Sequence, residues 1–174
     1  AKFSDGKSIT SEDVIFSWKT LRDSGRPHTR SYYSMIKEYE KINDKRIKFY
    51  FSENSNFEMP LIIGLMPIFH SKYWSDKNFT KTTLDPFISS GPYKIDRIET
   101  GRSITYIKNE NWWKKDNKDS AGRYNFKKIR YDFYRDQNVA LEAFLSGEYD
   151  INIENDAVRW KNSYHNNKET KIIK

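Results

Sequence analysis

The segment from Phe126 to Glu154 constrains the fold of this chain most strongly, because it joins a strand pattern, a capped helix pattern and a second strand pattern. Apolar residues alternate through residues 129–134 with the period of a strand that buries one face. Asp136 then stands at the N-cap of a helix, and Gly147 supplies the left-handed residue that ends it. Tyr149–Ile153 is predicted to form the second strand.

A strand, helix and strand unit of this length favours a crossover in which the two strands run parallel and the helix covers their sheet. Ligands of such sheets bind beyond the carboxyl ends of the strands. Arg135, at the end of the first strand, and Glu154, at the end of the second, are therefore candidate binding residues. The alternative is that both are solvated charges at strand ends. Because the pattern stops after this unit, we expect a fragment of a larger, two-lobed protein.

The N-terminal segment FSDGKSITSEDVIFSW predicts a turn followed by a capped helix. Thr10 stands at the N-cap, and Asp13, three residues later, completes a capping-box pattern. An apolar face then continues through Val14, Trp18 and Leu21. This helix is predicted to be part of the scaffold and to carry no chemistry.

The middle segment ISSGPYKIDRIETGRSITYIKNENWWKKD predicts a loop and then a β-hairpin. Its strands are expected at Tyr93–Ile98 and Ser103–Lys108, joined by a four-residue connection. The loop at residues 89–92 could offer backbone donors to an anion, but no helix follows it to complete such a site. Patterns elsewhere predict a hairpin around residues 42–51 and a short helix from Pro60 to Leu65.

In their order along the chain, these segments resemble the periplasmic substrate-binding proteins of peptide and nickel ABC importers, the family 5 extracellular solute-binding proteins. With GRPHTRSYYSMIKEYEKIND and NFEMPLIIGLMPI included, the sequence is most similar to the branch for oligopeptide and microcin C uptake. The resemblance implies a mixed α/β (α+β) fold of the periplasmic-binding-protein type II kind. Only the first lobe is expected, as a mixed sheet with flanking helices and a small α/β subdomain.

The resemblance also implies a division of the chain. Residues 3–69 would form the smaller subdomain of the first lobe, residues 73–154 part of its main sheet domain, and residues 155–174 the start of the crossing to a second lobe. The signal peptide, the second lobe and the residues that clamp a peptide's amino terminus would lie outside this sequence. Tyr32 and Tyr33 fall in a segment similar to the family's cleft lining and are candidate peptide contacts. Packing within the small subdomain explains them equally well.

By resemblance, the protein is a substrate-binding component that captures extended oligopeptides, or peptide-like antibiotics, in the bacterial periplasm and delivers them to an inner-membrane ABC permease. It is expected to be a monomer with no catalysis, cofactor, metal ion, nucleic acid or membrane insertion. Because two lobes would close on the ligand, the isolated 174-residue fragment is expected to bind peptides weakly or not at all.

Composition agrees with a binding role for a soluble domain. Hydrophobic residues make up 36% of the chain, which is low for a compact domain, so the 16% of aromatic residues must carry much of the core. There is no cysteine, which excludes disulfides and thiolate chemistry. The most apolar neighbourhood, Leu61–Phe69, contains Gly64 and Pro67 and is too short to span a bilayer.

The formal charge of +7 supports an alternative function. Residues 101–135 hold ten Lys and Arg against four Asp and Glu, interleaved with aromatic residues. This composition is also typical of proteins that bind single-stranded nucleic acid. Acidic residues interrupt the stretch and no known nucleic-acid motif accompanies it. A basic nucleic-acid-binding domain, or a non-catalytic interaction domain, therefore stays as the alternative.

The titratable residues do not predict an enzyme. His28, His70 and His165 are far apart in the sequence, which excludes a pair of histidine ligands on one helix. His70 follows an apolar run and is expected to be a capped loop residue and not a ligand or a base. No nucleophile elbow, P-loop or dinucleotide-binding glycine pattern is present in the sequence.

Overall fold

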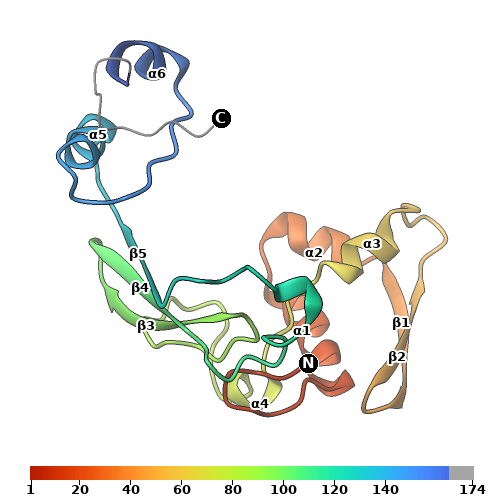
Figure 1. Ribbon diagram of the computed structural model, residues 1–174. Coiled ribbons are helices and arrows are strands. Elements are labelled where there is room, and N and C mark those ends of the chain that lie inside the picture. Colours follow the sequence, from red (N-terminus) through yellow and green to blue (C-terminus); the bar gives the residue numbers. More distant parts are fainter. Residues whose placement is uncertain (165–174) are drawn as a thin grey trace. The chain divides into compact units, whose positions relative to one another are not determined.

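The computed structural model describes residues 1–164, which form two compact units (Figure 1). The first unit comprises Ala1–Thr100 and Ile104–Tyr131, and the second comprises Gly101–Ser103 and residues 132–164. Among the described residues, no helix is both long enough and apolar enough to cross a lipid bilayer.

Short helices and two small sheets make up the chain, as the mixed α/β expectation requires. The helices are α1 (Ser11–Ser24), α2 (Pro27–Tyr33), α3 (Met59–Gly64), α4 (Ser71–Trp74), the 3-10 helix η1 (Lys118–Ser120), α5 (Gln137–Leu145) and α6 (Ala157–Ser163). The strands are β1 (Ile36–Asn43), β2 (Arg46–Phe51), β3 (Tyr93–Glu99), β4 (Ser103–Lys108) and β5 (Lys128–Asp132).

Helix α1 provides the main core of the first unit. The predicted buried face is confirmed for Trp18 and Leu21, which lie in one cluster with Tyr33, Ile36 and Met66, while Val14 packs against this cluster from its edge. The Trp18 ring makes edge contacts with Tyr39 and Phe49, at 5.4 and 5.9 Å between ring centroids, and so covers the hairpin. Its indole N–H donates to the Tyr33 carbonyl at 3.0 Å, which satisfies the one polar group of a buried ring.

Both predicted hairpins are present. Strands β1 and β2 pair antiparallel, with Tyr39 opposite Phe49. The second sheet has three strands in the order β3, β4, β5 (Figure 1). The backbone bonds from Phe133 to Arg102 and from Lys108 to Lys127 flank the pairing of β4 with β5. Residue numbers fall along one strand as they rise along the other, so these two strands run antiparallel.

The expected second strand at Tyr149–Ile153 is wrong. The helix before it forms as predicted, because the Asp136 carboxylate accepts the N–H groups of Asn138 and Val139, and Gly147 ends it at a φ of +82°. Residues 149–153 are then loop, with the Ile151 side chain 72% exposed. The Tyr149 hydroxyl instead donates to the Ala140 carbonyl at 2.8 Å, so this segment packs back on α5.

A strand exists only when a neighbouring strand takes up its backbone hydrogen bonds. Among the described residues no strand offers that pairing to residues 149–153, and the parallel crossover unit does not form there. The alternation of residues in this segment is typical of a strand, but no neighbouring strand among the described residues is in place to pair with it.

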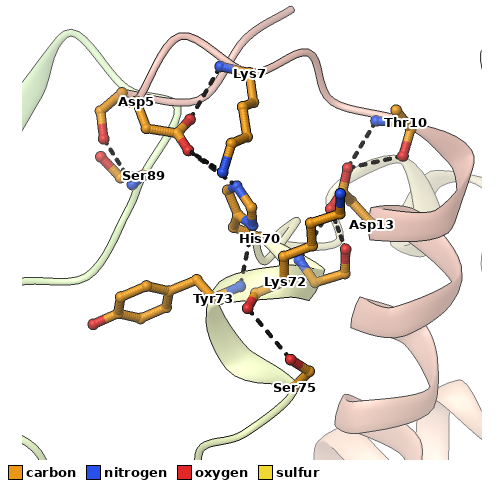
Figure 2. Close-up of polar contacts among 11 residues, drawn as sticks. Asp5, Lys7, Thr10, Asp13, His70, Lys72, Tyr73, Ser75 and Ser89 are labelled. Atoms are coloured by element: carbon orange, nitrogen blue, oxygen red, sulfur yellow. Dashed lines mark hydrogen bonds and ion pairs between the residues drawn. The ribbon is translucent and has the colours of Figure 1, made fainter.

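A buried carboxylate, Asp13, links α1 to α4. One of its oxygens accepts the backbone N–H and the hydroxyl of Thr10, at 2.9 and 3.0 Å, which confirms the capping-box contact (Figure 2). The other accepts the backbone N–H and the hydroxyl of Ser71, at 3.0 and 2.7 Å. Burial acts to raise the pKa of Asp13, but these four hydrogen bonds outweigh it and lower the pKa.

His70 holds the other side of the same junction. Its ring lies against Phe3 and is buried, and its Nδ1 accepts the backbone N–H of Tyr73 at 3.2 Å, so His70 is the N-cap of α4 (Figure 2). In the neutral ring the proton then lies on Nε2, which donates to the Asp5 carboxylate at 3.2 Å. The sequence led us to expect a capped loop residue at this position, whereas the structure shows that His70 itself caps α4.

Replacing Asp13 with Ala is expected to lower the free energy of unfolding by about 3 kcal/mol, because the buried donors of Thr10 and Ser71 lose their acceptor. Asp23→Ala is the matched control, since Asp23 lies on the same helix, is exposed, pairs with its neighbour Arg22 and should change stability by less than about 1 kcal/mol. Urea unfolding of both variants measures the difference. Equal effects would show that Asp13 does not carry the junction.

The same carboxylate predicts a dependence on pH. Because the folded pKa of Asp13 lies below its ordinary value of 3.8, its ionisation stabilises the fold above that value and the stabilisation is lost as the pH falls through the folded pKa. The stability difference between the wild type and Asp13→Asn should therefore shrink below about pH 4, since both side chains are then uncharged. Urea unfolding between pH 7 and pH 2.5 tests this, and a constant difference would contradict it.

Candidate functional site

A polar hollow of about 360 Å³ opens in the second unit. Helix α5, the loop before α6 and α6 itself line it, through Gln137, Ala140, Asn152, Ile153, Glu154, Asn155, Asp156 and Arg159. Apart from one alanine and one isoleucine, every lining side chain carries a hydrogen-bonding group. The hollow therefore suits a ligand with several polar groups.

Local capping positions the acidic residues of the hollow. Asp156 is the N-cap of α6 and accepts the backbone N–H of Arg159 at 2.8 Å, and this hydrogen bond lowers the pKa of Asp156. The Glu154 carboxylate accepts the backbone N–H of Asp156 at 2.7 Å. The loop and the start of α6 are thus fixed by side chains of the loop itself.

Glu154 is the most enclosed charge in the hollow, with its side chain 5% exposed. Its Oε2 lies 3.5 Å from Nη1 of Arg159 and accepts the hydroxyl of Tyr164 at 3.3 Å. Burial raises the pKa of Tyr164, a hydrogen bond from Asn152 opposes that shift, and the charge of Glu154 adds to it. The Tyr164 hydroxyl is therefore a neutral donor at physiological pH.

The electrostatic balance of the hollow is slightly acidic. The guanidinium of Arg159 lies between the carboxylates of Glu154 and Asp156, at 3.5 and 3.9 Å. Two negative charges therefore face one positive charge, and amide groups of Asn152 and Gln137 lie beside them. Such a set can pair with both the donors and the acceptors of a peptide backbone. Within residues 1–164, no group of three or more metal-ligating side chains gathers in one place.

The structure separates the two charged candidates from the sequence. Glu154 lines the hollow together with Arg159 and Asn152. Arg135 belongs to the same unit and directly precedes the N-cap of α5, but its exposed side chain is not part of the lining. Their role in binding stays a prediction.

The two tyrosine candidates have different environments. Tyr33 is buried in the core cluster of the first unit, and burial raises its pKa. Tyr32, its neighbour in α2, is 47% exposed. The packing alternative therefore describes the side chain of Tyr33, while Tyr32 is free to contact a ligand. A peptide contact by either residue stays a prediction.

Sequence reasoning missed the part of the hollow that comes from α6. From the sequence, residues 155–174 were assigned only to the start of a crossing and no helix was predicted there, yet Ala157–Ser163 is a helix. Asp156 before a run that contains Val158 and Trp160 was a usable N-cap signal. His165 lies outside the described residues.

Comparison with known proteins assigns the chain to a family. Residues 1–173 match the model of a protein family that is described as "bacterial extracellular solute-binding proteins, family 5 Middle". The probable peptide-binding protein YejA of Agrobacterium fabrum is 36% identical over 171 residues, which cover 94% of this chain and 28% of that protein. The peptidoglycan-binding protein YepA of the same species is 34% identical over 159 residues, which cover 91% of this chain and 26% of that one.

Solved structures show the same relationship. The binding protein AgaA of A. tumefaciens R10, in complex with agropinic acid, superposes with a TM-score of 0.73 and 26% identity over 86% of this chain and 29% of its own. The chain thus belongs to the family 5 bacterial extracellular solute-binding proteins and has their type II fold, as the resemblance implied. It spans about 28% of the length of the first of these relatives.

The burial difference between the two tyrosines predicts a difference in their mutants. Tyr33→Ala should lower the free energy of unfolding by about 3 to 5 kcal/mol, because it leaves a cavity beside Trp18 and Leu21. Tyr32→Ala should cost less than about 1 kcal/mol, because the ring is half exposed. Thermal unfolding by circular dichroism measures both, and a larger loss for Tyr32 would contradict the assignment of the core.

Proposed function

We propose that this chain forms part of the substrate-binding component of an ABC importer, which captures extended oligopeptides in the periplasm and delivers them to an inner-membrane permease. The observation that carries the proposal is the family match over residues 1–173, together with 36% identity to a protein named as a probable peptide-binding protein. In this proposed role the protein binds and delivers its ligand, and no residue of the chain acts as a catalyst.

The chemistry of the hollow supports a peptide ligand. Its carboxylates, amides and guanidinium alternate acceptors with donors, as a main chain with one N–H and one C=O per residue requires. The peptide stems of peptidoglycan present the same groups, so a peptide ligand is also consistent with the similarity to the peptidoglycan-binding protein YepA. Contacts to the main chain would give a grip that is independent of sequence, and the ligand's side chains would then set the preference.

Four residues are proposed as peptide contacts or supports. Glu154 would accept donors of the ligand from within the hollow, and Arg135 would offer a guanidinium to a carbonyl or carboxylate. On α2, the exposed Tyr32 would contact a peptide directly, and the buried Tyr33 would support it by packing α2 against the core. The division into residues 3–69, 73–154 and 155–174 belongs to the same proposal.

A thermal-shift titration of the full-length protein that carries these residues tests the function. Di- to decapeptides are expected to raise the melting temperature, and at equal concentration a tighter ligand should raise it more, because binding to the folded state alone adds RT ln(1 + [L]/Kd) of stability. A short single-stranded oligonucleotide serves as the comparison. A shift with the oligonucleotide alone would replace the transport proposal with nucleic-acid binding, and no shift with either would leave a plain interaction domain.

The contact residues can be tested in the same protein. Arg135→Ala and Glu154→Gln should each weaken peptide binding about 12-fold to 160-fold, since a hydrogen bond to a charged group is worth about 1.5 to 3 kcal/mol. Arg46→Ala is the control, because Arg46 is an equally exposed arginine on β2. Calorimetric titration gives the dissociation constants. Unchanged affinity in Arg135→Ala, with a normal melting temperature, would remove that residue from the site.

A further inference from the structure

The stretch from Trp113 to Lys128 combines exposed aromatic rings with an excess of positive charge. It holds six Lys and Arg against two Asp, and nearly all of its residues are exposed. Trp113, Tyr124 and Phe126 keep 44%, 38% and 65% of their surface accessible. The peptide-binding proposal uses none of these residues.

The aromatic rings are held in place by the structure beneath them. The indole N–H groups of Trp112 and Trp113 both donate to the Ser90 carbonyl, at 2.9 and 3.1 Å. Tyr124 packs edge-on against Trp112 at 5.1 Å between ring centroids, with its backbone at a φ of +57°. A non-glycine residue in this region is uncommon and needs support from its surroundings. The Trp113 and Tyr124 rings are therefore held in place, while the Phe126 ring, close to Tyr124 in the sequence, has 65% of its surface exposed.

The charges of the stretch are available for a partner. Within residues 1–164, no ion pair engages the side chains of Lys118, Arg123, Lys127 or Lys128, all of which are exposed. By contrast, the ammonium group of Lys114 lies 3.4 Å from the carboxylate of Asp119. The ammonium group of Lys115 donates to the Glu110 carbonyl at 3.1 Å, so four of the six cations remain on the same stretch as the three exposed rings.

We propose that this surface, defined as Trp113, Lys118, Arg123, Tyr124, Phe126, Lys127 and Lys128, docks the protein reversibly on a membrane that contains anionic phospholipid. Lysine and arginine are attracted to the negative surface potential of such a membrane. Exposed Trp, Tyr and Phe insert shallowly at the level of the headgroups. Neither the electrostatic attraction nor the shallow insertion of aromatic rings requires a helix that spans the membrane.

A lipid surface accounts for these features better than a nucleic acid does. Three of the four cations are lysines, which act as point charges and match a field of headgroups without fixed geometry. Trp112 is buried and Tyr124 packs edge-on against it, so Trp112 offers no open face on which a base could stack. A membrane location also fits the permease partnership proposed above, on which this inference otherwise does not depend.

Co-sedimentation of the full-length protein with vesicles tests the proposal. Vesicles of phosphatidylcholine with 30% phosphatidylglycerol should bind the protein at least tenfold more strongly than vesicles of phosphatidylcholine alone, and raising the salt from 50 to 500 mM should abolish the difference. The surface variant carries Lys118→Gln, Arg123→Gln, Lys127→Gln and Lys128→Gln. The matched control carries Lys2→Gln, Lys37→Gln, Lys81→Gln and Lys94→Gln, which are exposed lysines elsewhere and give the same net charge.

Loss of vesicle binding in the surface variant, with binding kept in the control, is the expected result. Equal loss in both variants would overturn the proposal, because net charge alone would then explain the attraction. The proposal would also be overturned if the protein did not bind the anionic vesicles. It would be overturned as well if the protein preferred a single-stranded oligonucleotide over the vesicles at the same concentration of phosphate groups. Peptide titration of the same two variants should give unchanged dissociation constants, so that failure of the docking surface and failure of the peptide proposal are distinguishable.

Discussion

The buried carboxylate of Asp13 is the interaction on which the first unit depends. It is enclosed and charged, which is favourable only because four donors from Thr10 and Ser71 surround it. By holding the start of α1 against the start of α4, it orients the face of α1 that carries Trp18. That face packs Trp18 into the core with Tyr33 and against Tyr39 of the hairpin β1 and β2.

In the second unit, carboxylates also accept backbone N–H groups at the start of a helix. Glu154 and Asp156 take up backbone N–H groups at the start of α6 while they pair with Arg159. Here the charged groups also border a hollow and remain within reach of a ligand. Capping in the first unit builds scaffold, whereas capping in the second positions groups that the proposed peptide would meet. The difference arises from the surroundings of the carboxylates and not from their chemistry.

Local signals in the sequence predicted the local elements well. The caps at Thr10 and Asp136, the left-handed end at Gly147 and both hairpins depend on residues within a few positions of one another. The strand at Tyr149–Ile153 failed because a strand needs a partner that no local pattern supplies. Helix α6 was missed although Asp156 marked its start, because its apolar residues are too few to show a clear period.

The sequence by itself determined the family, the scaffold helix and the residue types available for binding, since motif order and capping are written in short segments. Only the tertiary structure decided that Tyr33 is enclosed while Tyr32 is exposed, and that Glu154 joins Arg159 and Asn152 in one hollow while Arg135 stays outside its lining. Burial and proximity depend on how distant segments pack together. That information is held in the sum of many weak contacts and in no single motif.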